Sequence, residues 1–279
     1  MSKIDGRWNR DAILANEHAV RLEDTMSPRI EGVKAFFAKP RNYLLPRNFN
    51  IQLRAKVVQE FVGDHTFRSI LDIGCGNGAV SLPLLRPQTH LTLVDVSPEM
   101  LARARARIPE ALVEQVELIN EDFLSVALPV HSYDLILCLG VLAHVAPPGA
   151  VISKMASLLQ PNGSMIVQNT DEQHPLSYMK HLYSLLRNRL LPAQNRSHRS
   201  YPLNRLGGTA LLEHFKHQGL ALAATYRYNM PFPGMGRVLS DDERYRFIRK
   251  IYGTTARNTC GWLGCECIYH FQYLETTEG

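Results

Sequence analysis

The sequence lacks any apolar run as long as the roughly 18–20 residues that a membrane-spanning helix requires. Charged residues are scattered through residues 1–50, so the pattern of a secretory signal is missing as well. Cysteine is scarce and odd in number: the five residues argue against a disulfide framework and fit a reducing compartment. These absences predict a soluble protein of the cytoplasm.

Acidic residues are few in one part of the chain. Residues 180–257 contain 14 Lys and Arg against 4 Asp and Glu, whereas residues 69–179 contain 5 against 11. The basic segment either meets an anionic substrate or surface, or forms a solvated, arginine-rich face. The length of 279 residues and the hydrophobic content of 45% favour one large domain with additions.

Glycine is concentrated in residues 69–79, SILDIGCGNGA. An apolar run breaks into Gly74, Gly76 and Gly78, and the apolar positions that follow predict a helix over residues 77–85. A strand, a glycine turn and a helix are typical of the start of a nucleotide-binding α/β unit. Alternate glycines permit unusual backbone angles and let a ligand lie directly against the main chain.

Strand and helix patterns alternate after this turn, which predicts an α/β fold with a doubly wound, mostly parallel sheet. We expect residues 1–68 to form an N-terminal helical cap and residues 69–279 to form the core. Residues 171–206 interrupt the alternation as an insertion over the pocket. The predicted strands are 70–73, 91–94, 116–119, 133–139, 164–169, 220–228 and 265–274, and the predicted helices after the turn are 98–107, 149–159, 175–191, 209–217 and 241–252.

Acidic side chains follow successive predicted strands, at the edge where a doubly wound sheet binds its ligands. Asp95 ends the second strand, where a carboxylate can accept hydrogen bonds from ribose hydroxyls. Asp122 and Phe123 follow the third strand and offer an acceptor and an apolar wall for an adenine ring. A nicotinamide cofactor also fits, because Gly74, Gly76 and Ala79 match G-x-G-x-x-A and Asp95 lies near the expected distance.

The internal Asp72, the third glycine, Asp122 and the Pro-Asn-Gly turn at residues 161–163 together resemble the class I S-adenosylmethionine-dependent methyltransferases. The resemblance covers residues 69–170 closely and residues 207–274 loosely. It implies a seven-stranded Rossmann-like sheet with an antiparallel final strand, and S-adenosylmethionine as the cofactor. The cofactor-binding residues that it implies are Asp72, Gly74, Gly76, Gly78, Asp95, Val96, Asp122, Phe123 and Leu139.

Two histidines are candidate bases, which methyl transfer needs only when the nucleophile must lose a proton. His144 lies in GVLAHV after the fourth strand, on an expected short helix, and His174 lies in NTDEQH after the fifth. A buried structural histidine and a polar loop residue are the competing interpretations. Candidate substrate-binding residues are Tyr43 before the first strand and Arg196, Arg199 and Tyr201 in the insertion. Cys260, Cys265 and Cys267 lack a paired fourth ligand, so no metal is predicted.

The sequence thus predicts a methyltransferase for a small, partly apolar and anionic metabolite, such as a lipid, glycan, prenyl or secondary-metabolite intermediate. O-methylation is slightly preferred because a histidine base is available. The basic segment leaves an RNA methyltransferase open, although nucleic acid is not the partner we expect. A non-catalytic regulatory protein that binds S-adenosylmethionine also remains open, and the oligomeric state is not predicted.

Overall fold

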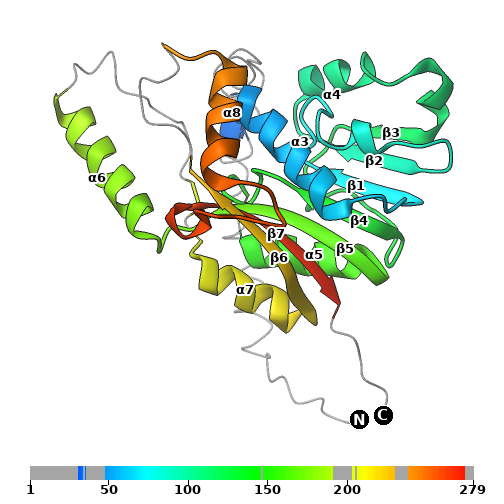
Figure 1. Ribbon diagram of the computed structural model, residues 1–279. Helices are drawn as coiled ribbons and strands as arrows, with labels where there is room; N and C mark the ends of the chain where they lie inside the picture. Colours follow the sequence, from blue (N-terminus) through cyan, green and yellow to red (C-terminus); the bar gives the residue numbers. More distant parts are fainter. Residues whose placement is uncertain are drawn as a thin grey trace, which may run out of the picture.

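A seven-stranded sheet forms the centre of the molecule (Figure 1), with the strand order β3-β2-β1-β4-β5-β7-β6. The computed structural model describes residues 31–33, 35, 48–145, 147–190, 203–204, 206–229 and 238–273. Strands β1 to β5 pair in parallel, and β7 pairs antiparallel with β5 and β6. The predicted fold class is therefore confirmed, including the antiparallel last strand. The strands are β1 Ser69–Ile73, β2 His90–Val94, β3 Val116–Ile119, β4 Tyr133–Cys138, β5 Leu159–Thr170, β6 Leu220–Tyr228 and β7 Glu266–Tyr273.

Helices cover both faces of the sheet. Helices α3 (Asn48–Val62) and α8 (Asp241–Tyr252) pack on one face, with Leu53 and Ile248 in the same buried cluster. Helices α5 (Pro148–Leu158) and α7 (Gly208–His217) pack on the other face, where Met155 and Phe215 are buried together (Figure 1). Burial from both sides explains why the central strands are nearly unbroken apolar runs.

Helix α4 (Pro98–Arg105) begins where the sequence predicts. The Ser97 hydroxyl accepts a hydrogen bond from the Met100 N–H, and Pro98 occupies the first helical position. The helix stands at the carboxyl end of β2, so the same corner of the fold carries a strand end and a helix N-terminus.

The helix predicted over residues 77–85 is wrong. The chain forms turns there, followed by the short 3-10 helix η1 (Leu82–Leu84). Gly78 has a positive φ of 68°, and Pro83 has no N–H to donate to a preceding carbonyl, so a regular α-helix is interrupted at both positions. The Ser81 side chain is consequently held beneath the glycine turn rather than on a helix surface.

The start of β5 and the segment around His144 also differ from prediction. Strand β5 begins at Leu159, which pairs with Tyr133, and the register shifts before Ser164. Asn162 has a φ of 65°, so the Pro-Asn-Gly turn lies within the irregular first part of β5. His144, expected on a short helix, lies in a turn at residues 142–144.

Helix α6 (Pro175–Leu190) follows β5 and confirms the helix predicted at residues 175–191. It stands apart from the sheet in Figure 1 and has no large covered face among the described residues. Six large apolar side chains of α6 are at least half exposed: Tyr178, Met179, Leu182, Tyr183, Leu185 and Leu186. Within the described ranges, no helix is long and apolar enough to cross a membrane.

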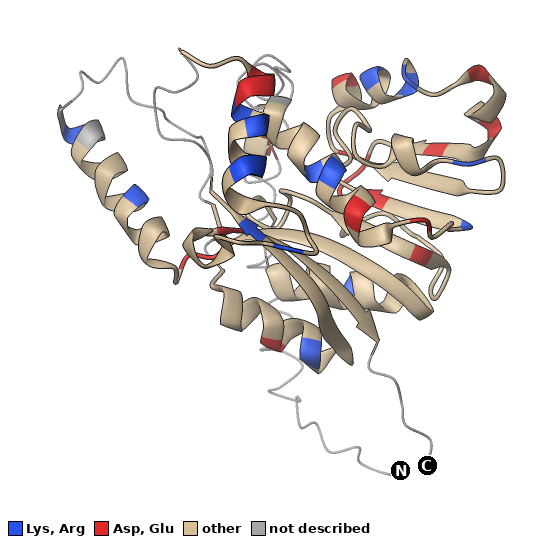
Figure 2. Cartoon of the chain, in the orientation of Figure 1, with Lys and Arg blue, Asp and Glu red and all other residues tan. Residues whose placement is uncertain are grey.

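Ion pairs use part of the basic excess of residues 180–257. Arg227 pairs with Asp171, Arg244 with Asp241, and Arg249 with Glu60. Figure 2 shows that α8 carries acids at its start and cations along its length, an arrangement that complements the helix dipole. The part of the basic segment that the structure describes is therefore not a uniformly cationic face.

Glu60 joins α3 to α8 and so fixes the helix that borders the glycine turn. Its carboxylate accepts hydrogen bonds from the Arg249 guanidinium and from the Thr255 N–H at 2.9 Å. The Arg249 guanidinium also lies over the Tyr226 ring, 5.6 Å from its centroid. The pair is largely buried, so removal of one partner leaves the other charge poorly solvated.

We expect Glu60→Ala to lower the free energy of unfolding by about 2 kcal/mol, the cost of losing charged hydrogen bonds. Glu114→Ala, on the exposed surface of the 3-10 helix η2 (Glu110–Gln115), is the matched control and should change it by less than about 0.5 kcal/mol. Urea unfolding measures both values. Equal stabilities of the two variants would contradict the role of Glu60.

Candidate functional site

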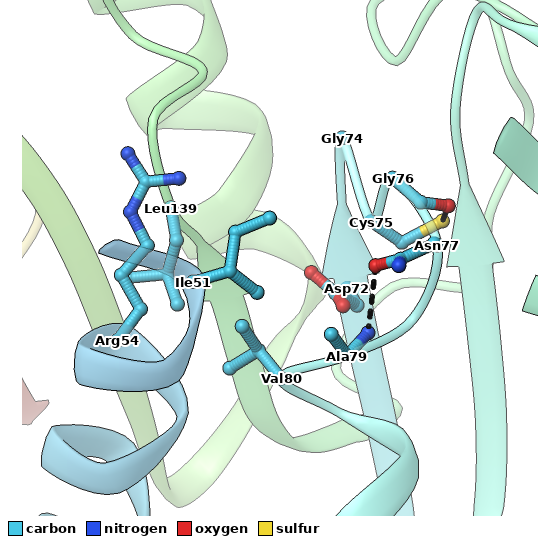
Figure 3. A pocket seen from close by; sticks show the side chains of 10 residues that line it. All are labelled: Ile51, Arg54, Asp72, Gly74, Cys75, Gly76, Asn77, Ala79, Val80 and Leu139. Carbon is cyan, nitrogen blue, oxygen red and sulfur yellow. Dashed lines mark hydrogen bonds between the residues drawn. The ribbon is translucent and has the colours of Figure 1, made fainter. Parts of the chain in front are cut away.

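A small recess lies between α3 and the glycine turn, at the carboxyl edge of β1 and β4. Figure 3 shows Ile51 and Arg54 of α3 on one side, the glycine turn on the other and Asp72 between them. The position agrees with the rule that ligands of a doubly wound sheet bind beyond the carboxyl ends of its strands. The lining residues are Ile51, Arg54, Asp72, Gly74, Cys75, Gly76, Asn77, Ala79, Val80 and Leu139.

The three glycines of the turn all have positive φ values, 64° at Gly74, 55° at Gly76 and 68° at Gly78. The space around the three glycines differs from one position to the next. A Cβ atom at Gly74 would lie 2.3 Å from Val141 Cγ2, and one at Gly78 would lie 2.7 Å from Leu82 Cδ1. At Gly76 a Cβ would meet no described atom within 4 Å and would stand at the recess. Gly74 and Gly78 thus serve packing, whereas Gly76 leaves space for a ligand.

Asp95 ties the turn to the end of β2. One carboxylate oxygen accepts from the Gly76 N–H at 2.8 Å and the other from the Ser97 N–H at 2.8 Å. Burial raises the pKa of Asp95, and these two backbone hydrogen bonds oppose the rise. Each carboxylate oxygen has a further lone pair for a ligand hydroxyl. Val96 follows it, half-buried, at the bend between β2 and α4.

Asp72 is buried at the base of the recess and is 3% exposed. The Ser81 hydroxyl donates a hydrogen bond of 2.6 Å to its carboxylate. Burial raises the pKa of Asp72 to about 7; the Ser81 hydrogen bond lowers it, and the nearby Asp95 charge raises it. A cationic ligand group in the recess would favour the ionised form of this carboxyl.

The loop after β3 carries Asp122 and Phe123, the predicted adenine contacts. An Asp122 oxygen accepts from the Leu124 N–H at 3.0 Å, and the Phe123 side chain is buried. Lys154 of α5 holds this loop by donating to the Phe123 carbonyl at 2.6 Å and the Val126 carbonyl at 2.5 Å. Its ammonium also lies 4.9 Å from the Phe123 ring centroid. Sequence reasoning missed Lys154, although it is the single charged residue of α5.

Arg54 is the second residue that sequence reasoning missed. It lies on α3, is 8% exposed and lines the recess. Its guanidinium packs against Gly140, where an added Cβ would come within 2.7 Å of Nη2. The signal in the sequence was a lone arginine next to the buried positions Leu53, Val57 and Val58 of one helix.

Neither His144 nor His174 is among the residues that line the recess. His174 Nδ1 accepts from the Leu176 N–H at 3.2 Å, and Nε2 lies 3.0 Å from the Trp262 carbonyl oxygen. Both ring nitrogens thus hold the start of α6 against the 3-10 helix η5 (Gly261–Leu263). His144 is half-buried in the turn after β4, and its backbone N–H donates to the Val141 carbonyl at 2.7 Å. Their catalytic roles stay predictions.

The predicted substrate residues Tyr43, Arg196, Arg199 and Tyr201 lie outside the described residues. Leu139, predicted at the cofactor, lines the recess at the end of β4. Among the described residues, no three His, Cys, Asp or Glu side chains are grouped closely enough to hold a metal ion.

Comparison with protein families matches residues 70–163 to a family described as a methyltransferase domain. Curated relatives include ubiquinone biosynthesis O-methyltransferases. The protein from Xylella fastidiosa is 33% identical over 101 residues, 35% of this chain and 40% of the relative. The protein from Aeromonas salmonicida is 33% identical over 113 residues, which are 40% of this chain and 47% of the relative. The chain thus spans less than half the length of these relatives.

Solved structures share the fold over most of the chain. A methyltransferase from Thermotoga maritima, described as a possible histamine N-methyltransferase, superposes with a TM-score of 0.60 at 15% identity, covering 88% of this chain and 99% of that one. The magnesium protoporphyrin IX methyltransferase from Synechocystis, solved with S-adenosylhomocysteine, superposes with a TM-score of 0.57 at 19% identity. The superposition covers 88% of this chain and 100% of that one.

The raised pKa of Asp72 predicts a specific pH dependence of stability. An unfolded aspartate ionises near pH 4, whereas the folded carboxyl keeps its proton to about pH 7. Between these values the folded state binds more protons, so stability falls as pH rises through this window and then levels off.

Asp72→Asn keeps an oxygen for the Ser81 hydroxyl and should not show this fall. We expect the variant to gain stability relative to the wild type between pH 5 and pH 7, at about 1.4 kcal/mol or less per pH unit. Urea unfolding at pH 5, 6, 7 and 8 measures the difference. A difference that stays constant over this range would show that Asp72 titrates normally.

Proposed function

We propose that this chain, which carries a class I methyltransferase domain in residues 70–163, transfers the methyl group of S-adenosylmethionine to a small, partly apolar acceptor. The observation that carries the proposal is the recess itself. A glycine turn with one glycine open to a ligand faces a buried guanidinium, and acids stand at the ends of β1 and β2.

The described residues fit each part of S-adenosylmethionine. Asp95 has lone pairs for the ribose hydroxyls, and Asp122 with Phe123 offers an acceptor and an apolar surface for the adenine. The Arg54 guanidinium suits the methionyl carboxylate, and the Asp72 carboxyl suits the ammonium group. Gly76 leaves the backbone open to the ligand. The cofactor, when bound, supplies a methyl group already activated by a sulfonium.

Alignment of the acceptor in a dry site is then the main task of the protein. O-methylation is the proposed reaction because His144 follows β4, at the same edge of the sheet as the recess, and could accept the proton of a hydroxyl. His174 is the second candidate base, and its Nδ1 accepts a hydrogen bond from the Leu176 N–H. The names of the curated relatives, which are O-methyltransferases, support the same choice.

The apolar character of the acceptor is proposed from α6. This helix leaves the carboxyl end of β5, on the edge of the sheet where the recess opens, and its large apolar side chains are exposed. We propose that residues 171–206 form the roof of the acceptor site, with Arg196 and Arg199 available for an anionic group. The relatives' names, ubiquinone biosynthesis and magnesium protoporphyrin IX, are consistent with a partly apolar acceptor.

Gly76→Ala should separate ligand binding from folding. The alanine must adopt a left-handed φ, which costs roughly 1–2 kcal/mol, and its methyl group would enter the recess. Gly63→Ala is the matched control, because Gly63 has a φ of 53° and open space but lies at the end of α3, outside the recess.

We expect calorimetry to show a loss of S-adenosylhomocysteine affinity of more than tenfold for Gly76→Ala and less than twofold for Gly63→Ala. Thermal unfolding should shift similarly in both variants without ligand. Stabilisation of the wild type by NAD(P) instead of S-adenosylhomocysteine would overturn the cofactor assignment.

Turnover is tested with methyl-labelled S-adenosylmethionine and a panel of phenols and carboxylic acids, each with and without an apolar tail. We expect label in the hydroxyl acceptors, a lower KM for those with a tail, and a raised KM for the tailed acceptors in Leu182→Glu. Tight S-adenosylhomocysteine binding without turnover, on this panel or on a metabolite extract, would instead indicate a regulatory protein. Labelling of RNA with a steep salt dependence would indicate a nucleic-acid substrate.

A further inference from the structure

A buried polar cluster lies next to the recess, on the face of the sheet covered by α3. Its centre is the hydroxyl of Tyr228 in β6, which donates to Asn50 Oδ1 at 2.7 Å and accepts from Gln168 Nε2 at 3.1 Å. Tyr228 is fully buried, and Asn50 and Gln168 are each 4% exposed. Three elements far apart in the sequence, α3, β5 and β6, therefore meet at one oxygen atom.

Arg54 completes this cluster. It follows Asn50 by four residues on α3, so the two side chains lie on the same face of the helix. Burial raises the pKa of Tyr228, and the Arg54 charge and a hydrogen bond with Arg54 oppose the rise. A tyrosine oxygen can donate once and accept twice. Donation to Asn50 and acceptance from Gln168 and Arg54 use its full capacity.

The guanidinium is confined on its other side as well. Gly140, just after β4, has a φ of 76° and no side chain, and Arg54 Nη1 and Nη2 fill the space that a Cβ would take. An arginine side chain loses rotamer entropy when it is held in one orientation. Tyr228 and Gly140 impose that orientation before any ligand arrives, which reduces the cost of binding.

We propose that Tyr228 is a positioning residue for the cofactor. Its hydroxyl, fixed by Asn50 and Gln168, holds the Arg54 guanidinium so that it faces the recess and binds the carboxylate of the methionyl group. This inference rests on the proposed function, since it assumes a cofactor with an amino-acid carboxylate in the recess. Tyr228 itself is absent from the recess lining and acts through Arg54.

Tyr226 provides a matched control on the same strand. It is also fully buried on the same face of β6, and its ring lies 6.0 Å from that of Tyr228. Its hydroxyl, however, donates to the Gly253 carbonyl at 3.1 Å, at the end of α8. Both tyrosines are 0% exposed as residues, so Tyr226→Phe removes a hydroxyl from an equally enclosed side chain of the same strand. Tyr226 is not among the residues that line the recess.

The experiment measures two ligands by calorimetry on the full chain. S-adenosylhomocysteine has the carboxylate, whereas 5′-methylthioadenosine has the same nucleoside and sulfur but no amino-acid group. We expect Tyr228→Phe to raise the Kd of S-adenosylhomocysteine about tenfold and that of methylthioadenosine less than twofold. Tyr226→Phe should leave both Kd values unchanged. In Arg54→Met, addition of Tyr228→Phe should cause no further loss.

An equal loss for both ligands in Tyr228→Phe would show a merely structural role, and no loss for either would also overturn the proposal. If Tyr228→Phe does not fold, Asn50→Ala tests the same point, since it removes the acceptor that orients the Tyr228 hydroxyl. Asn50→Ala should raise the Kd of S-adenosylhomocysteine more than that of methylthioadenosine. A wild type that binds neither ligand would refute the proposed function itself, whereas selective binding by the wild type without a Tyr228 effect refutes this inference alone.

Discussion

The hydrogen bonds between the glycine turn and the end of β2 are the constraint on which the rest of the site depends. The Gly74 N–H donates to the Val94 carbonyl at 2.8 Å, and the Gly76 N–H donates to the Asp95 carboxylate at 2.8 Å. These bonds hold Gly74 and Gly76 in a left-handed conformation that side chains resist. Because Asp95 also accepts from Ser97, the same carboxylate aligns the turn, the strand end and the start of α4.

The opposite wall of the recess depends on contacts between distant parts of the chain. Helix α3 reaches its position through Glu60, which contacts Arg249 and Thr255, and through the Asn50 contact with Tyr228. Arg54 therefore stands on a helix that is fixed at both ends against β6 and α8. The Arg54 guanidinium is buried and lines the recess, where an anionic ligand group could contact it. The contacts that fix α3 therefore also fix the position of the Arg54 charge at the recess.

Local patterns explain what could be predicted from the sequence. The glycine turn, the apolar strands and the Ser97 cap each depend on neighbouring residues, and the strand ends place Asp95 and Asp122 at one edge. Arg54 and Lys154 were missed because their roles arise from partners more than 25 residues away, at Tyr228 and in the loop after β3. The helix predicted at residues 77–85 does not form, because Gly78 and Pro83 interrupt the helix that the apolar spacing indicates. Tertiary contacts and breaks in the backbone pattern thus limit what the sequence alone can predict.

The proposed division of the chain into a donor part and an acceptor part rests on a contrast between two segments. The family match ends at residue 163 and includes the turn, Asp95 and the loop after β3, the residues proposed to bind the cofactor. The segment after β5 instead presents large apolar side chains on a helix that the described sheet does not cover. Covering exposed apolar side chains with another apolar group lowers the free energy. A partly apolar acceptor under the roof would supply part of that cover, so acceptor binding and the ordering of α6 would be linked.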